Sequence, residues 1–335
     1  EMLTHLEAQG HQVVVASYDR GYHNLQGDFN TLKIAGLSIV SDDNRVSPLR
    51  TITQNISALP KGKASLEAVK RDLFKVSRPD CVITDFEPMT AYLANHYDVP
   101  LISLDNQHRI RYMNYPCPKR YKKDALITET VVRAMVPKPD VSLITTFYFG
   151  QLKNDRSFLF PPILRQAVLE LTPSRSDHIV VYATAGFETL LTELAAYTRE
   201  RFLVYGYPKD QRDGPLQFKP FSRDGFLQDL ASAKGVIATA GFTLMTEALY
   251  LGKPCLALPM RGQFEQILNG IMLAHLGYGK NATRLYHDTV PAFLYHLPDY
   301  TDRLQGYDRR GNQAIFAKLD ALLADDCRLV RAMHR

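Results

Sequence analysis

Residues 239–266 read TAGFTLMTEALYLGKPCLALPMRGQFEQ, and this stretch decides the fold. A turn at Gly241 closes the apolar strand GVIATAG and leads into the helical sequence TLMTEALYL. Gly252 ends that helix, and the short apolar strand CLALP follows. A strand, a helix and a second strand in this order are typical of a parallel sheet covered by helices. Because a helix N-terminus carries free N–H groups, the turn is also a candidate phosphate site.

Several side chains of this stretch suit a nucleotide ligand. Gly241 lets a ligand approach the backbone closely, and Thr239 and Thr243 add hydroxyl groups. Glu247 lies one helical turn beyond Thr243, where its carboxylate can accept two hydrogen bonds from a diol such as a ribose. The Glu-Gln pair at 265–266 begins the next helix and can meet polar groups of a sugar. The alternative is an ordinary strand–turn–helix unit with a glycine cap.

The rest of the chain repeats the alternation of strands and helices, which predicts two α/β domains. We expect an N-terminal domain over 1–155, a proline-stiffened linker over 156–175 and a C-terminal domain over 176–335. Since open α/β sheets bind ligands at the carboxyl ends of their strands, the cleft between the domains is the expected site. The expected strands are 12–18, 32–40, 81–86, 99–105, 141–149, 178–186, 201–206, 235–241 and 254–259, and the expected helices are 65–77, 89–97, 187–200, 226–233, 243–252 and 264–277.

The composition of the 335 residues is that of a packed protein, with 45% hydrophobic and 22% charged residues. No apolar run is long enough for a transmembrane helix, and the four cysteines form no CxxC pair. We therefore expect a cytoplasmic protein without a metal site. The net charge of +5 is too small to imply nucleic acid by itself. The first residues read as the middle of a fold, so we expect an upstream segment.

The spacing of six residues in and beyond the opening stretch resembles the donor-nucleotide signature of GT-B glycosyltransferases. The likeness is to UDP-sugar transferases of plant secondary metabolism and, more closely, to the GlcNAc transferase that makes the peptidoglycan lipid precursor. Three other segments, VITDFEPMTAYLA, VPLISLDNQH and FPPILRQAVLEL, resemble a bacterial and archaeal glycosyltransferase group labelled teichoic-acid-biosynthesis-related. The six residues are Glu247, Gly252, Pro254, Pro259, Gln266 and Asn269.

The resemblance implies two Rossmann-like domains that face each other, with a UDP-sugar on the second and the acceptor on the first. Thr239 stands where the plant motif has histidine, and Phe242 stands where it has tryptophan. By resemblance, the loop at Gly186 lies near the donor diphosphate or the sugar, and the backbone of Phe221 holds the uracil edge. A tight turn and a loop aromatic that plugs the core are the respective alternatives. The donor residues implied are Gly186, Phe221, Thr239, Gly241, Phe242, Thr243, Glu247 for the ribose, and Glu265 and Gln266 for the sugar.

Two residues of the first domain are candidate catalytic groups. Asp85 follows the strand CVIT, and by resemblance it orients a histidine base from the first strand–helix loop, which would precede Glu1. A local cap for the next helix is the alternative for Asp85. His108 follows the strand PLISLD in a polar cluster, where it can bind an acceptor or act as a base. A satisfied loop histidine is its alternative.

A basic run with interleaved tyrosines, RIRYMNYPCPKRYKK, occupies residues 109–123. Cations and aromatic rings suit an anionic membrane surface, so the run is a candidate peripheral membrane contact beside a lipid acceptor. A solvated basic loop is the alternative. Nucleic acid is not expected, because no DNA-binding motif accompanies the run.

The expected reaction is inverting, metal-independent transfer of a sugar from a UDP-sugar to an acceptor hydroxyl of a lipid or cell-envelope glycan. The donor is a substrate, and no cofactor is expected. Two other functions stay open at this point. One is a UDP-sugar 2-epimerase of the same fold, which needs no acceptor. The other is a non-catalytic protein that binds sugar nucleotides or serves as a scaffold.

Overall fold

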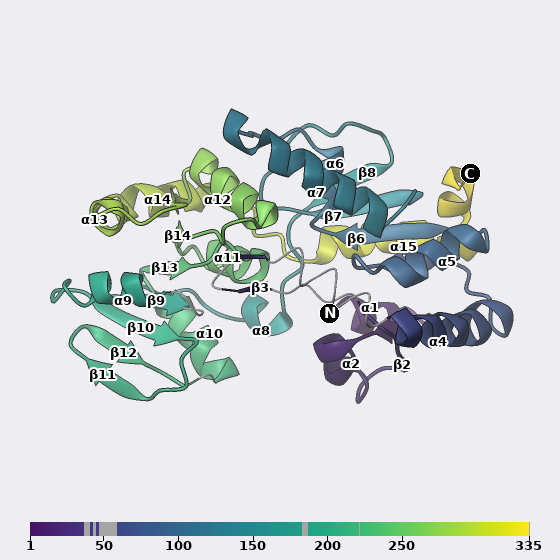
Figure 1. Ribbon diagram of the computed structural model, residues 1–335, viewed down its shortest axis with the longest axis horizontal. Coiled ribbons are helices and arrows are strands. Elements are labelled where there is room, and N and C mark those ends of the chain that lie inside the picture. Colours follow the sequence, from purple (N-terminus) through teal and green to yellow (C-terminus); the bar gives the residue numbers. More distant parts are fainter. Residues whose placement is uncertain (37–40, 43–44, 47–58, 183–186, 221, 335) are drawn as a thin grey trace.

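The computed structural model describes residues 1–36, 41–42, 45–46, 59–182, 187–220 and 222–334. The described chain forms two halves that lie side by side, each built on its own sheet with helices around it (Figure 1). Parallel pairing dominates both sheets, which confirms the predicted α/β class.

The first half is centred on four parallel strands in the order β5-β6-β7-β8. β6 and β7 are buried at every position, because their apolar sequences LISLD and VSLIT are covered on both faces. A parallel pair, β1 with β2, and an antiparallel pair, β3 with β4, stand apart from this sheet. The strands are β1 (Val15–Ser17), β2 (Thr31–Lys33), β3 (Ser41–Asp42), β4 (Arg45–Val46), β5 (Val82–Thr84), β6 (Leu101–Asp105), β7 (Val141–Thr145) and β8 (Ser157–Phe160).

The helices of the first half begin and end where local chemistry requires it. Before α5, the Glu87 carboxylate accepts hydrogen bonds from the N–H groups of Met89 and Thr90 at 2.7 and 2.8 Å. Pro88 fills the first helical position, where its missing N–H costs nothing. These helices are α1 (Met2–Ala8), α2 (Asp19–Leu25), α4 (Leu59–Val69) continued by a π-helix (Lys70–Lys75), α5 (Pro88–His96), α6 (His108–Tyr112), a 3₁₀ turn (Lys119–Tyr121) and α7 (Lys122–Met135).

The second half contains a seven-stranded sheet in the order β11-β12-β10-β9-β13-β14-β15. All neighbours except β11 and β12 run parallel. From β12 onward this is the doubly wound order 3-2-1-4-5-6, whose ligand crevice lies where the order reverses. Here that point lies between β9 and β13. The strands are β9 (His178–Tyr182), β10 (Arg201–Tyr205), β11 (Gln211–Asp213), β12 (Leu216–Phe218), β13 (Gly235–Ala238), β14 (Cys255–Ala257) and β15 (Gly279–Asn281).

Two helices around the second sheet have a glycine or a serine at one end. Gly252 adopts a φ of +72° directly after α11, a left-handed conformation that glycine reaches without strain, and so ends the helix as expected. The Ser222 hydroxyl caps the start of α10 through the N–H of Gly225. The helices are α8 (Gln166–Leu169), α9 (Glu188–Leu194), α10 (Arg223–Ser232), α11 (Phe242–Tyr250), α12 (Phe264–Leu276), α13 (Thr289–Tyr295), α14 (Leu297–Arg303), a 3₁₀ turn (Leu304–Gly306) and α15 (Gln313–Met333).

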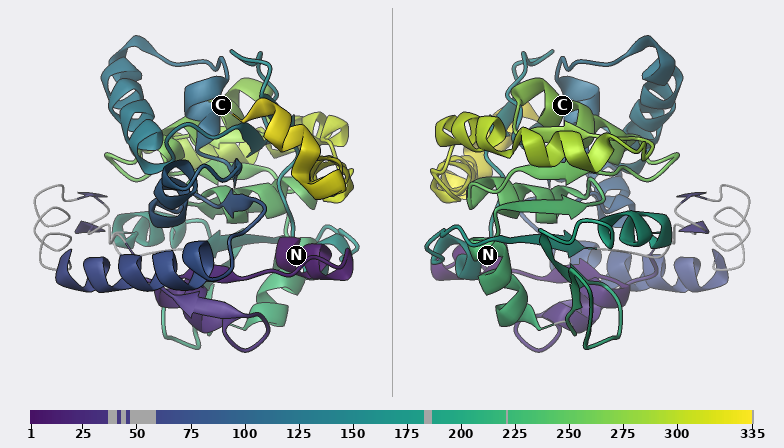
Figure 2. Two further views of the ribbon diagram at one scale, coloured as in Figure 1. Left: turned by 90° about the vertical axis from the view of Figure 1, so that its right-hand side faces the viewer. Right: turned by 90° about the vertical axis from the view of Figure 1, so that its left-hand side faces the viewer.

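Two segments belong to the first half, although the expected domain limits place them in the linker and in the second domain. Residues 157–160, expected in the linker, form β8 and pair with β7. Residues 313–333, expected in the second domain, form α15, which returns to the first half and lies against its sheet (Figures 1 and 2). Ile315 and Leu319 of α15 are buried in one cluster with Leu143 of β7. None of the described helices is both long and apolar enough to span a bilayer.

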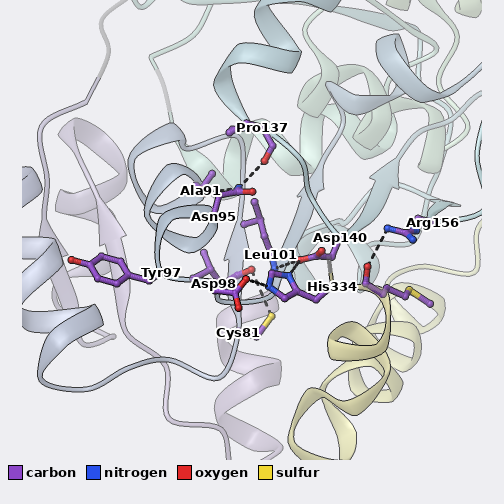
Figure 3. A network of polar contacts seen from close by, with 12 residues as sticks. Cys81, Ala91, Asn95, Tyr97, Asp98, Leu101, Pro137, Asp140, Arg156 and His334 are labelled. Carbon is purple, nitrogen blue, oxygen red and sulfur yellow. Dashed lines mark hydrogen bonds and ion pairs between the residues drawn. The ribbon is translucent and has the colours of Figure 1, made fainter.

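The end of α15 is fastened to the first half by a histidine between two carboxylates (Figure 3). His334 Nδ1 lies 3.0 Å from Asp140, and its Nε2 lies 2.9 Å from Asp98. Asp140 also accepts a hydrogen bond from the N–H of Leu101 at the start of β6. Burial opposes the charged imidazole, but the two carboxylates outweigh it and raise the pKa of His334.

This contact makes a pH-dependent contribution to stability. A raised pKa means that the contribution is complete below the unfolded value of about 6.5 and is lost as pH rises through the folded value. We expect His334→Ala to lower the free energy of unfolding by about 0.5–1 kcal/mol at about pH 6 and by less at about pH 9. Urea unfolding at both pH values measures this difference. An equal effect of the substitution at both would contradict the assignment.

Candidate functional site

The two halves meet where the carboxyl ends of their strands face each other. Phe147 follows β7 and lies 6.3 Å, between ring centroids, from Phe242, which begins α11 after β13. Ile110 and Met113 are buried in the same apolar cluster as the core of the second half. A cavity of about 260 Å³ at this interface is lined by none of the predicted site residues. Its lining residues are Thr146, Phe147, Tyr148, Phe149, Pro161, Pro162, Leu276, Tyr278, Gly306, Tyr307 and Asp308.

The turn after β13 has the properties expected of a phosphate site. Gly241 is the N-cap of α11, and no side chain caps the first N–H groups of the helix. A Cβ on Gly241 would meet no described atom closer than the Thr239 hydroxyl at 3.9 Å, so the space beside it is open. Thr243 is exposed in the first turn. The turn therefore offers free donors at the switch point of the sheet, together with a macrodipole that favours an anion.

Glu247 lies one turn farther along α11 and is 2% exposed. Arg165, which precedes α8 in the connection between the halves, donates Nε to one carboxylate oxygen at 2.7 Å and Nη2 to the other at 2.8 Å. A carboxylate has about four lone-pair sites, so this two-point contact leaves about two of them for a ligand diol. The two-point contact holds the carboxylate in one orientation. Its contact with a ribose stays a prediction.

The predicted sugar residues lie at the start of α12, and their environments differ. Gln266 accepts a hydrogen bond from the N–H of Met260 at 3.0 Å and so shapes the loop before the helix. Burial raises the pKa of Glu265, while Arg109 and a hydrogen bond with Gln107 oppose the rise. Gln107 is the N-cap of α6 and Arg109 lies in its first turn, so Glu265 faces residues of the first half.

His108 is fully buried and paired with Asp105, the last residue of β6. The imidazole Nδ1 lies 2.7 Å from one Asp105 oxygen, and the other oxygen accepts the backbone N–H of His108 at 2.8 Å. Because the Asp105 carboxylate accepts a hydrogen bond from Nδ1–H, the lone pair of the neutral imidazole lies on Nε2. Nε2 has no hydrogen-bond partner within the described chain. This is the arrangement in which an aspartate orients a histidine base.

Asp85 follows β5 at the same edge of the first sheet. It does not cap α5, since Glu87 performs that role. Asp85 is exposed to solvent, although the protein around it partly desolvates its carboxyl group. This partial loss of solvent, together with the charge of Asp105, raises the pKa of Asp85 to about 6. A carboxyl with such a pKa changes its charge close to physiological pH.

The raised pKa predicts the effect of Asp85→Asn on stability. Because the folded chain disfavours the ionised carboxyl, stability falls as pH rises from about 4 through about 6. The amide lacks this penalty. After allowance for solvent screening, the variant's free energy of unfolding should exceed that of the parent by on the order of 1 kcal/mol at about pH 8 and should equal it at about pH 4. Urea unfolding at the two pH values measures it. A variant that is no more stable than the parent at the higher pH would refute the assignment.

The basic run at 109–123 is only partly at the surface, which corrects the expectation. Arg109 is fully buried: its Nη2 donates to Asn269 of α12 at 2.5 Å, and its guanidinium lies 5.0 Å from the ring centroid of Phe242. Burial lowers the pKa of Arg109 to about 10. Arg111 is half-buried. Exposed cations of the run are Lys119, Arg120, Lys122 and Lys123.

Gly186 and Phe221, predicted for the donor diphosphate and the uracil, lie outside the described residues. Sequence reasoning placed Asp105 in the polar cluster beside His108 without pairing the two, counted Arg109 with the basic run, and assigned no role to Arg165. The three-residue spacing of Asp105 and His108 in LDNQH could have predicted their pairing. Nothing local marks Arg165, whose partner lies 82 positions away. In the described part of the chain, no three His, Cys, Asp or Glu side chains gather to hold a metal ion.

Comparison with known proteins now decides the family. The family described as Glycosyl transferase family 1 matches residues 1–298. The chain belongs to glycosyl transferase family 1. A curated relative from Methanosarcina mazei, named an uncharacterized glycosyltransferase, is 25% identical over 251 residues. The match covers 66% of this chain and 64% of the relative, so the chain spans just under two thirds of that protein.

Solved structures of glycosyltransferases share the fold of this family member. The glycotransferase of kitacinnamycin is 18% identical with a TM-score of 0.67, and the match covers 100% of this chain and 94% of that one. The calicheamicin glycosyltransferase CalG4 is 15% identical with a TM-score of 0.66, over 97% and 94%. Arabidopsis thaliana UGT89C1, solved with UDP-L-rhamnose, is 16% identical with a TM-score of 0.63, over 100% and 94%. The GT-B fold predicted from the sequence is confirmed.

Proposed function

We propose that this chain transfers a sugar from a UDP-sugar to an acceptor hydroxyl, with the donor on the second half. One observation carries the proposal. A buried carboxylate at Glu247, paired with Arg165, lies one turn beyond the uncapped N-terminus of α11, at the switch point of a doubly wound sheet. A diphosphate at the turn and a ribose at the carboxylate fit this spacing. Membership of glycosyl transferase family 1 supports the reaction type.

Uracil is the proposed base of the donor nucleotide. The resemblance of the 239–269 segment to UDP-sugar signatures supports it, and so does the fold shared with UGT89C1, which was solved with UDP-L-rhamnose. Glu265 and Gln266 are the proposed sugar contacts at the start of α12. Gly186 and Phe221 remain proposed donor contacts on the strength of the sequence alone. The finer likeness to the peptidoglycan and teichoic-acid groups stays a hypothesis.

The proposed chemistry is a single displacement with inversion. The acceptor oxygen attacks the anomeric carbon, the bond from that carbon to the diphosphate oxygen breaks, and a base takes the hydroxyl proton. His108 is the proposed base, since its Nε2 lone pair is free and Asp105 stabilises the imidazolium that forms. The imidazole is covered in the structure, so the covering side chains must move before an acceptor reaches it. Asp85 stays a second proposed catalytic group at the same edge of the first sheet.

The reaction also requires stabilisation of the negative charge that develops on the leaving diphosphate. The N–H groups of Gly241 to Thr243 and the macrodipole of α11 are the proposed stabilising groups. In this proposal no metal ion takes part. The proposed acceptor is a lipid or cell-envelope glycan, and the proposed location is cytoplasmic, at the inner face of a membrane.

A product assay tests the proposal and its rivals together. The purified chain is incubated with radiolabelled UDP-sugars, with and without extracted lipid acceptors, in the presence of a chelator. A labelled lipid with inverted anomeric configuration by NMR is the expected product. A changed sugar nucleotide without any acceptor would indicate a 2-epimerase. Tight UDP binding without any product would favour a non-catalytic binding protein.

A further inference from the structure

Helix α7 presents an apolar face to solvent. Leu126, Ile127 and Val131 are 66%, 53% and 49% exposed, whereas Val132 on the opposite side is buried. The helical spacing places Ile127 and Val131 in one row with Leu126 beside it. The helix lies along the outside of the first half (Figures 1 and 2). An apolar helix face normally packs against the core, so this orientation marks α7 as a candidate interaction surface.

A neighbouring helix extends the same surface. Tyr92 of α5 is 53% exposed, and its hydroxyl donates to the carbonyl of Ala134 in α7 at 2.8 Å. The ring is thereby held beside the last turn of α7. Tyrosine combines an apolar ring with a polar tip and is frequent where apolar and aqueous regions meet. We call Tyr92, Leu126, Ile127 and Val131 the α7 patch.

Exposed cations adjoin the α7 patch at the start of the helix. Lys122 and Lys123 occupy the first turn of α7, and Lys119 and Arg120 form the 3₁₀ turn before it. On the same helix, Asp124 is exposed and Glu129 is paired with Arg133 at 3.4 Å. Positive charge therefore dominates this end. Apolar side chains flanked by lysine and arginine match the boundary between acyl chains and anionic headgroups.

We propose that α7 docks the chain on an anionic lipid bilayer, with the α7 patch in the headgroup–acyl boundary and the four cations at the headgroups. The inference deepens the proposed function, because it names the surface that delivers a lipid acceptor. α6, which begins at His108, packs against α7. Docking through α7 therefore holds the proposed base and the carboxyl end of β6 close to the bilayer.

Flotation with lipid vesicles tests the docking. The purified chain is mixed with vesicles of phosphatidylcholine alone or of phosphatidylcholine with phosphatidylglycerol, and the bound fraction is measured at low and high salt. We expect binding to the mixed vesicles that weakens with salt. Combined Leu126→Ser, Ile127→Ser and Val131→Ser should lower binding at least about tenfold. Lys122→Gln and Lys123→Gln should each lower binding to the mixed vesicles about fivefold, and together they should weaken the preference for anionic lipid.

Matched controls keep the test specific. Tyr286→Ser and Tyr295→Ser remove exposed aromatic rings, 61% and 80% exposed, from the second half and should leave vesicle binding unchanged. UDP affinity, measured on the same samples, should stay that of the parent in every variant. If UDP binds normally while the chain ignores anionic vesicles, the docking proposal fails and the donor site stands. Dimerisation abolished by the three serine substitutions would also overturn the proposal, because a second copy would then cover the patch.

Discussion

Glu247→Gln should weaken UDP binding roughly 100-fold. The parent carboxylate has lone pairs left for the ribose hydroxyls, and hydrogen bonds to a charged acceptor are each worth about 1.5–3 kcal/mol. The amide loses the charge and turns one acceptor into a donor, so a net loss of about 3 kcal/mol is expected. Arg165→Gln keeps the carboxylate but removes the group that orients it, and we expect a smaller loss of about tenfold. Isothermal titration with UDP measures both.

The control for Glu247 is a second ion-paired glutamate in the same half. Glu200 pairs with Lys234 and lies directly before β10, at the amino end of the sheet. Glu200→Gln should therefore bind UDP as the parent does. Thermal unfolding of all variants separates loss of the site from loss of the fold. If Glu247→Gln is folded and binds UDP like the parent, Glu247 does not hold the ribose.

His108→Gln should lower the transfer rate about 10²–10⁴-fold while UDP affinity stays unchanged. General-base catalysis contributes a factor of this size, and the donor site lies on the other half. Asp105→Asn should lower the rate as well. With its oxygen on the backbone N–H of His108, the amide would turn its NH2 group toward Nδ1 and favour the wrong tautomer. Steady-state assays at saturating donor measure the rate, and the UDP affinity of the same samples reports on the fold.

The chain offers a matched histidine–carboxylate pair as the control. His5 of α1 lies 2.7 Å from Asp320 of α15, the same separation as between His108 and Asp105. His5→Gln removes such a pair away from the strand ends and should leave the rate unchanged. If His108→Gln turns over like the parent, the base is another group. Asp85 would then be the next candidate.

The parts of the fold set by local chemistry were predictable. The apolar run VSLIT forms the buried strand β7, and Gly252 takes the left-handed conformation that ends α11. The helix N-terminus at Gly241 and the position of Glu247 follow from the same short-range rules. These features depend only on neighbouring residues, so a single sequence is enough to predict them.

Long-range contacts were not predictable in the same way. The amphipathic pattern of α15 shows that it packs on a sheet but does not say which sheet. The Arg165–Glu247 pair joins residues 82 positions apart. Arg109 looked like a surface cation among other cations, yet the second half supplies Asn269 and Phe242 and buries it. In each case the partner comes from a distant element, and the local sequence says nothing about it.

Calorimetric titration of the unmodified chain with UDP, GDP, ADP and TDP tests the central claim most directly. The claim is that the turn at Gly241 and the carboxylate of Glu247 form a nucleotide-diphosphate site for uridine. Binding of UDP in preference to the other three, at one site per chain, is the predicted result. A folded chain that includes any upstream segment and binds none of the four would contradict the account.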